Sequence, residues 1–188
     1  VVFILFFFLK DSYLQQKIIL VLVSDKVIDR VEKSINKIKN LLSRYFLGLL
    51  LQITILLIIY SIDLAIFDVE NAFIIAFLCA LLNLIPYLGP IIGAILMILL
   101  TMSSFIGADF SDVILPKTTY VMIGFLIGQL VDNFFSQPFI FSNSVKSHPL
   151  EIFIVILASG IMLGPIGMII GIPLYTALKV IAQEFLSD

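Results

Sequence analysis

The chain consists mostly of long apolar runs, separated by short breaks that are either polar or contain Gly and Pro. Two runs, residues 45–62 and about 115–135, predict transmembrane helices, because about 20 apolar residues suffice to span the hydrocarbon core of a bilayer. Residues 1–9 are also apolar, but they lack the basic start and the cleavage site of a signal peptide. We therefore expect residues 1–9 to be the end of a truncated transmembrane helix.

Four shorter apolar runs form two pairs. The first pair, residues 71–85 and 91–104, surrounds Pro86, Tyr87, Leu88, Gly89 and Pro90; the second, residues 150–163 and 166–179, surrounds Gly164 and Pro165. An arm of about 14 or 15 residues is roughly 21 to 23 Å long as a helix, short of a hydrocarbon core of about 30 Å. Each pair therefore predicts a helical hairpin that either spans the membrane or re-enters it. Carbonyl groups that the prolines free at the tips would need protein, water or a ligand as partners.

Residues 24–44 follow a different pattern, in which apolar residues recur at spacings of three and four between charged ones. This spacing places Val27, Val31, Ile35, Ile38 and Leu42 on one stripe, and it predicts an amphipathic helix within a cytoplasmic segment 10–44. The helix either lies on the headgroups or packs on its own protein, which we favour, or it binds a partner.

A short repeat divides the rest of the chain. Leu88-Gly89-Pro90-Ile91 recurs as Leu163-Gly164-Pro165-Ile166, and each copy joins two short arms that follow one long span. The repeats cover residues 45–112 and 113–188. Each unit has an odd number of crossings whether its hairpin spans or re-enters, so the copies should be inverted relative to each other. The predicted fold is an all-α integral membrane protein, a polytopic helix bundle with two inverted repeats, each a long transmembrane helix plus a Gly/Pro-broken hairpin.

Composition supports the membrane class, since 61% of the residues are hydrophobic, 13% are charged and the mean hydropathy is +1.19. Eight of the eleven basic residues lie between Lys10 and Arg44, which should therefore be cytoplasmic by the positive-inside rule. Two acidic connections, residues 61–70 with Asp63 and residues 107–112, should then lie outside, and the C-terminus inside. Lys117, at the outer edge of its span, is the one exception.

The predicted span at residues 115–135 carries an unusual polar group towards its end. Gln129, Asp132, Asn133 and Gln137, before Pro138, are spaced i, i+3, i+4 and i+8, so they would share one face of a continuing helix. Such a face could line a hydrated path in which Asp132 binds a proton or cation. The alternative is that Asp132 simply lies at the cytoplasmic interface.

Other polar residues carry weaker signals. Asn83, before the first hairpin tip, could hydrogen-bond the freed carbonyls, which we favour, or bind solute, and Gln52 is expected to bond between helices. Cys79 is expected to be a small buried side chain. The candidate residues of a substrate or ion path are Asn83, Pro86, Tyr87, Gly89, Pro90, Gln129, Asp132, Asn133, Gln137, Pro138, Gly164 and Pro165.

Enzyme activity is not expected. The chain contains no HExxH, P-loop or GxGxxG motif. Ser159 and His148 faintly suggest a serine protease pair, but eleven residues apart on one helix they would be about 16 Å apart, beyond hydrogen-bond reach. We expect no catalytic residue, no metal site and no cofactor other than a coupling H⁺ or Na⁺. The expected partners are a lipid bilayer and a small solute or ion, not a nucleic acid.

Two longer stretches match a known family. Residues 83–94, Asn-Leu-Ile-Pro-Tyr-Leu-Gly-Pro-Ile-Ile-Gly-Ala, and residues 129–138 carry the match, which His148-Pro149-Leu150 and residues 160–167 continue. From about Phe8 to Phe185 the chain resembles the autoinducer-2 exporter family of bacterial membrane proteins, the PerM-like permeases, and would be the C-terminal portion of a member. Ser142, Lys146-Ser147 and Ser159 depart from the family pattern.

The resemblance implies a secondary transporter of the bacterial inner membrane that exports or exchanges a small solute, as a homo-oligomer. Members have been linked to export of the quorum signal autoinducer-2, and others to sodium or lithium/proton antiport, so an Na⁺(Li⁺)/H⁺ antiporter is the nearest alternative. A non-transporting membrane scaffold, which recruits a partner through residues 24–44, is an alternative of a different class.

Overall fold

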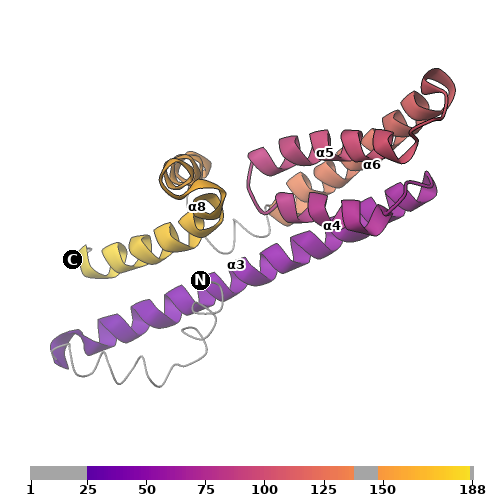
Figure 1. The fold of residues 1–188 in the computed structure, drawn as a ribbon. Helices are drawn as coiled ribbons and strands as arrows, with labels where there is room; N and C mark the ends of the chain where they lie inside the picture. Colours follow the sequence, from indigo (N-terminus) through magenta and orange to yellow (C-terminus); the bar gives the residue numbers. More distant parts are fainter. Residues whose placement is uncertain (1–24, 138–147, 187–188) are drawn as a thin grey trace.

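The computed structural model describes residues 25–137 and 148–186, which form helices and no strand (Figure 1). The elements in chain order are α3 (Asp25–Ile66), α4 (Ala72–Leu82), α5 (Leu88–Ser104), the π-helical η1 (Phe110–Ile114), α6 (Leu115–Val131), the π-helical η2 (Asp132–Ser136) and α8 (Pro149–Leu186). The predicted all-α class is therefore confirmed. The predictions for residues 1–9, for residues 10–24 and for Pro138 fall outside the described residues.

Helix α3 organises the molecule. Its 42 residues make it about 63 Å long, and α4, α6, η2 and α8 pack against it, whereas α5 packs on α4 and α6 (Figure 1). The amphipathic segment and the first predicted span are parts of this one helix. Along the amphipathic part, Val31, Ile35 and Ile38 are half-buried and Leu42 is buried, whereas Lys33 and its charged neighbours are exposed.

The prediction of an acidic connection from residue 61 is wrong for Asp63. The helix continues to Ile66, so Asp63 lies within α3 and is buried against α6. Asp68 and Glu70 do lie in the connection that follows, and both are exposed. Lys117, the exception to the charge pattern, bonds this connection, since its Nζ donates to the Phe67 carbonyl (3.0 Å) and lies 3.7 Å from an Asp68 oxygen.

The first predicted hairpin is present as α4 and α5, with a turn at residues 83–87. The break lies earlier than predicted, because α4 ends at Leu82 and α5 already begins at Leu88. Pro90 therefore lies in the first turn of α5, where its missing N–H costs no helical hydrogen bond. Gly89 lies in the same turn, so close to the Leu82 carbonyl that a Cβ would overlap it.

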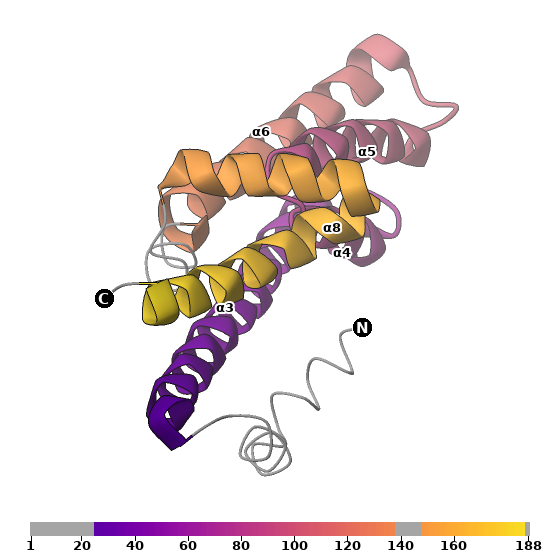
Figure 2. The ribbon, with the colours of Figure 1, turned by 90° about the vertical axis from the view of Figure 1, so that its left-hand side faces the viewer.

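The second predicted hairpin is the bent element α8, whose two arms meet at Gly164 (Figure 2). Gly164 adopts φ 67° and ψ −154°, a backbone conformation that residues with a Cβ rarely adopt. The arms pack closely, since a Cβ at Gly171 would overlap the Ser159 side chain. At the open end, Lys179 and Tyr175 each donate to Glu151, at 2.8 Å.

The helices have the lengths and surfaces of a membrane protein. Among the described residues, Arg30–Ile66, Phe110–Ser136 and Leu150–Phe185 are long and apolar enough to cross a bilayer, although the third contains the bend of α8. In the most apolar 18-residue stretch of each of these helices, only 28%, 28% and 17%, respectively, is buried inside the protein. Apolar side chains on the remaining surface need lipid rather than water around them, so the chain is a multi-pass membrane protein.

Helices α3 and α6 form the centre of the bundle. On α6, Gly124 and Gly128 are four residues apart, and the space above them is filled by the side chains of Asp63 and Tyr60 from α3. The Tyr60 ring also stacks on Phe125, with centroids 5.1 Å apart. Small residues at this spacing usually let two backbones approach in a membrane, but here they admit two polar side chains.

The close contact of α4 with α5 makes a test of the first hairpin. In Gly89→Ala the new methyl group would overlap the Leu82 carbonyl, a backbone atom, whereas in Gly93→Ala it would make ordinary contacts with the Phe125 ring (3.7 Å) and the Cys79 carbonyl (3.9 Å). We expect Gly89→Ala to be less stable than Gly93→Ala by about 1–3 kcal/mol, the usual cost of overpacking. Unfolding of both variants in mixed micelles measures this difference, and equal stabilities would contradict the observed packing.

Candidate functional site

A buried carboxylate lies where α3, η2 and the first hairpin meet. Asp132 is 0% exposed, and its Oδ2 accepts hydrogen bonds from the side-chain amides of Gln52 (3.0 Å) and Gln137 (3.1 Å). Gln137 follows Asp132 by five residues, which is the hydrogen-bonding period of the π-helical turn η2. The π-helical turn thus helps to bring the Gln137 side chain back onto Asp132.

The second oxygen of this carboxylate is not satisfied. Asp132 Oδ1 is buried and has no hydrogen-bond partner among the described residues. The Ser136 hydroxyl lies near the carboxylate without reaching hydrogen-bond geometry. Buried polar atoms are nearly always paired, so an oxygen without a partner among the described residues is a candidate position for a proton or a bound ion.

A second polar group lies next to the first, deeper between the helices. The Gln129 side-chain amide donates to the Tyr60 hydroxyl (2.8 Å) and to Asn83 Oδ1 (2.9 Å). Asn83 in turn donates to the Cys79 carbonyl (3.0 Å), one of the carbonyls at the end of α4. The Cys79 carbonyl also accepts from the Asn83 backbone amide, so it is not one of the carbonyls freed at the tip, and Asn83 joins the turn of the first hairpin to α6.

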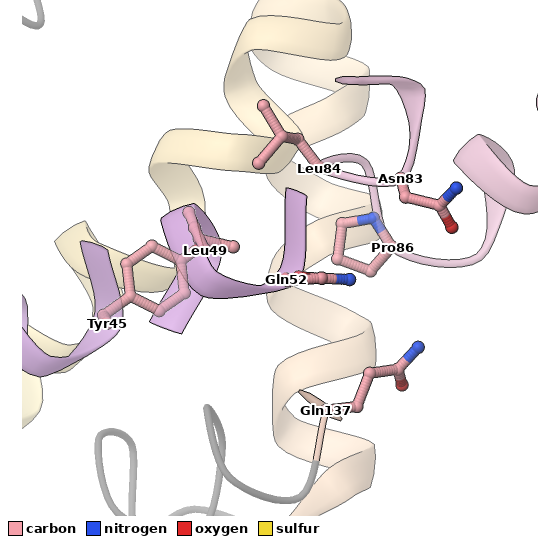
Figure 3. A pocket seen from close by; sticks show the side chains of 7 residues that line it. All are labelled: Tyr45, Leu49, Gln52, Asn83, Leu84, Pro86 and Gln137. Atoms are coloured by element: carbon pink, nitrogen blue, oxygen red, sulfur yellow. The ribbon is translucent and has the colours of Figure 1, made fainter. Parts of the chain in front are cut away.

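A small cavity lies between α3 and the turn of the first hairpin (Figure 3). Its volume is about 20 Å³, room for one water molecule. Seven residues from three parts of the chain line it: Tyr45, Leu49, Gln52, Asn83, Leu84, Pro86 and Gln137. Two of them, Gln52 and Gln137, are the residues that hold Asp132. The Gln52 and Gln137 side chains thus contact both the cavity and the buried carboxylate.

The second hairpin meets the first at the edge of this region. Tyr87, at the hairpin turn, packs edge-on against Phe153 of α8, with ring centroids 5.4 Å apart. Tyr87 has φ 66°, a strained conformation for a residue with a Cβ. On the other side, the Tyr45 hydroxyl donates to the Ile169 carbonyl of α8 (3.3 Å). Both hairpins therefore touch the residues around the cavity.

Comparison with known proteins now identifies the chain. The sequence model of the family described as AI-2E family transporter matches residues 1–187. The chain belongs to the AI-2E transporter family.

Three relatives show how far the similarity extends. YrrI of Bacillus subtilis (strain 168) is named as a candidate transport protein. It is 30% identical to this chain over 98% of this chain and 50% of its own length. YueF, from the same organism and similarly named, is 26% identical over 94% of this chain and 46% of its own. The AI-2 transport protein TqsA of Escherichia coli (strain K12) is 27% identical over 64% of this chain and 33% of its own.

The chain spans about half the length of the first two relatives. No solved structure matches it.

The residues predicted from the sequence of this AI-2E family member are only partly brought together. Asn83, Pro86 and Gln137 line the cavity, and Gln129 and Asp132 lie beside it. Three others have different positions: Gly89 and Pro90 pack within α5, and Tyr87 contacts the second hairpin.

The remaining predicted residues lie apart from the cavity or outside the described part. Asn133 is exposed and is connected to the site only through Gln137, which donates to its Oδ1 (2.9 Å), so it does not share the buried face of Asp132. Gly164 and Pro165 form the bend of α8 and do not line the cavity. Pro138 is not described.

Several residues of the site were not predicted from the sequence. Tyr45, Leu49 and Gln52 all face the cavity, and their spacing of i, i+4 and i+7 on α3 is the signal that could have found them. Tyr60 completes the deeper polar group.

Nothing in the described residues suggests a different kind of site. Residues 25–137 and 148–186 contain no cluster of three or more His, Cys, Asp or Glu that could hold a metal ion. The Ser159 hydroxyl donates to carbonyls of its own helix, at Val155 (2.6 Å) and Ile156 (3.2 Å). His148 Nδ1 accepts from the Leu150 amide at the start of α8 (3.3 Å).

The pairing of Gln52 with Asp132 can be measured by a double-mutant cycle. We expect Gln52→Leu and Asp132→Leu each to destabilise the protein, and the two changes together to cost less than their sum by about 0.5–3 kcal/mol. Thr54→Val is the matched control, because the Thr54 hydroxyl bonds only to the Leu50 carbonyl of its own helix. Strict additivity of Gln52→Leu and Asp132→Leu in micelle unfolding would exclude the pairing.

Proposed function

We propose that the chain forms part of a secondary transporter of the bacterial inner membrane, which exports or exchanges a small solute. In this proposal the path includes the cavity between α3 and the turn of the first hairpin, and Asp132 carries the coupling proton or sodium ion. The family shared with the AI-2 transport protein TqsA supports a transporter.

The half-satisfied Asp132 carboxylate is the observation that carries the proposal. A charge in a transmembrane helix is expensive, and such residues usually mark ion or substrate pathways. One oxygen of Asp132 is held by two amides, which fixes its position, and the other is buried and has no hydrogen-bond partner among residues 25–137 and 148–186. A carboxylate with a purely structural role would be expected to have both oxygens bonded. The neighbouring cavity has room for one water molecule and is lined by the two amide side chains that hold Asp132.

The two hairpins are the elements that we propose to move. Each reverses direction at a break, and the contact of Tyr87 with Phe153 joins them. Inverted repeats that rock about a central site would expose the cavity to each side in turn. The proposal includes the orientation with residues 10–44 and the C-terminus in the cytoplasm, and assembly as a homo-oligomer.

An Na⁺(Li⁺)/H⁺ antiporter remains the alternative within the family, because the same carboxylate could exchange a sodium ion for a proton. A membrane scaffold is the alternative outside it. The exposed charged side chains of Arg30, Glu32, Lys33 and Lys37 on α3 would be its binding surface, but the scaffold gives no role to the Asp132 oxygen that lacks a partner among the described residues.

Flux through the full-length protein in proteoliposomes tests the proposal. We expect Asp132→Asn to reduce coupled transport to the level of empty liposomes, because the amide can neither bind a proton nor attract a cation at this position. Autoinducer-2 and sodium should be tested side by side, since loss of only one flux identifies the substrate. Glu70→Gln, which removes an exposed carboxylate, is the matched control. Full flux in Asp132→Asn would contradict the proposal.

A crosslink between the hairpins tests the proposed movement. In a protein freed of other cysteines, a reductant-cleavable bis-methanethiosulfonate crosslinker with a spacer should join Tyr87→Cys to Phe153→Cys, because the two rings touch and their shortened replacements leave a gap. We expect the crosslink to stop transport and a reductant to restore it, because the joined hairpins could no longer separate. The two single-cysteine proteins serve as controls. Undiminished transport by the fully crosslinked protein would show that this contact does not open.

A further inference from the structure

A second buried carboxylate lies on α3, on the far side of Tyr60 from the cavity. Asp63 is 9% exposed, and its carboxylate occupies the space above Gly124 of α6. Asp63 Oδ2 is buried and has no hydrogen-bond partner among the described residues. Like Asp132, Asp63 therefore holds one buried oxygen that the surrounding helices leave free.

The charged and titratable groups around Asp63 are already engaged elsewhere. On α6, Lys117 bonds to Asp68 and to the Phe67 carbonyl, and the Tyr120 ring stacks on Phe67. On α4, the Cys79 thiol donates to the Gly93 carbonyl (3.6 Å). Helix α5 contains no titratable side chain.

On α3 itself, the Tyr60 hydroxyl accepts from Gln129. On the two remaining elements that pack on α3, Asp132 of η2 bonds to Gln52 and Gln137, and Tyr175 and Lys179 of α8 donate to Glu151; the other titratable group of α8, Glu184, is acidic. The basic residues of α3 itself lie at positions 26–44, at least 19 residues or roughly 28 Å along the helix from Asp63. Among the described residues, no cation is thus placed to balance a charge on Asp63.

Asp63 is one of the polar side chains of α3 that face α6 and η2. Asp63 lies against Gly124 of α6, and Tyr60 lies against Gly128 and Gln129 of α6. Gln52 lies against Asp132 of η2. Polar side chains therefore continue from the cavity past Tyr60 to Asp63, within helices that expose many large apolar side chains.

We propose that Asp63 is a second protonation site, which takes up one proton from the membrane side opposite to the cavity. A proton suits the site better than a metal ion, because a sodium ion needs several oxygen ligands and the facing residue is a glycine. Uptake converts the carboxylate to a neutral carboxylic acid, which removes an uncompensated charge from an apolar contact. Its use in transport rests on the proposed function, whereas protonation itself does not.

Difference infrared spectroscopy of the full-length protein in lipid nanodiscs tests protonation directly. On acidification we expect a carbonyl band of protonated carboxylic acids to which Asp132 and Asp63 both contribute; Asp63→Asn should remove one component of this band, which Asp112→Asn retains. Asp112 is the matched control because it is an exposed aspartate. An unchanged band in folded Asp63→Asn overturns the proposal.

A second variant keeps the test decisive if Asp63→Asn does not fold. In Gly124→Ala the new methyl group would overlap the carboxylate, which must then leave its place. We expect the band to remain but its titration midpoint to change, and an unchanged midpoint would contradict the assignment to Asp63.

Flux measurements separate the two proposals. With the pH varied on one side of the proteoliposome at a time, Asp63→Asn should lose the response to the pH on the side opposite to the cavity. Transport that keeps this response, together with an unchanged infrared band, overturns only the role of Asp63. An Asp63 band in a protein that transports nothing overturns only the proposed transport.

Discussion

The burial of polar side chains between helices that otherwise face lipid is the constraint on which this structure depends. In hydrocarbon, an unpaired polar group has no water to bond with, so polar side chains must meet one another or line a hydrated space. Helices α3 and α6 satisfy this requirement with Tyr60 and Gln129 at their centre. The glycines of α6 make the arrangement possible, because Gly128 leaves room for the Tyr60 ring. The position of Asp132 follows from the same packing.

Sequence patterns revealed the hairpins because Gly and Pro interrupt the apolar runs at points where a regular helix must end or bend. The same reasoning failed where local chemistry was ambiguous. An acidic residue after an apolar run resembles a loop, so Asp63 was misplaced, although α3 continues past it. The change from charged to apolar character near residue 44 does not interrupt the helix either, since both halves favour it.

The site was predicted only in part, because its geometry departs from that of an ideal helix and its partners lie on another helix. Spacing on an ideal helix brought Gln129, Asp132, Asn133 and Gln137 to one face, but in the structure Asn133 is exposed, and a π-helical turn helps to bring Gln137 back onto Asp132. No sequence signal marked that turn. The partner Gln52 was expected to bond between helices, and it does, but only the structure shows that its acceptor is Asp132. The two Leu-Gly-Pro-Ile copies also differ, since Gly89 packs within a helix and Gly164 forms a bend.

Alternating access requires the small cavity beside Asp132 to open to each side of the membrane in turn. Leu84→Cys places a thiol on the cavity wall, in a protein freed of other cysteines. The direct measurement is labelling of this thiol by a membrane-impermeant reagent, applied to one side of the membrane at a time. We predict reaction from each side, with the balance shifted by a gradient of the coupling ion. A thiol that reacts from one side only, or from neither, under every gradient would contradict alternating access at this cavity.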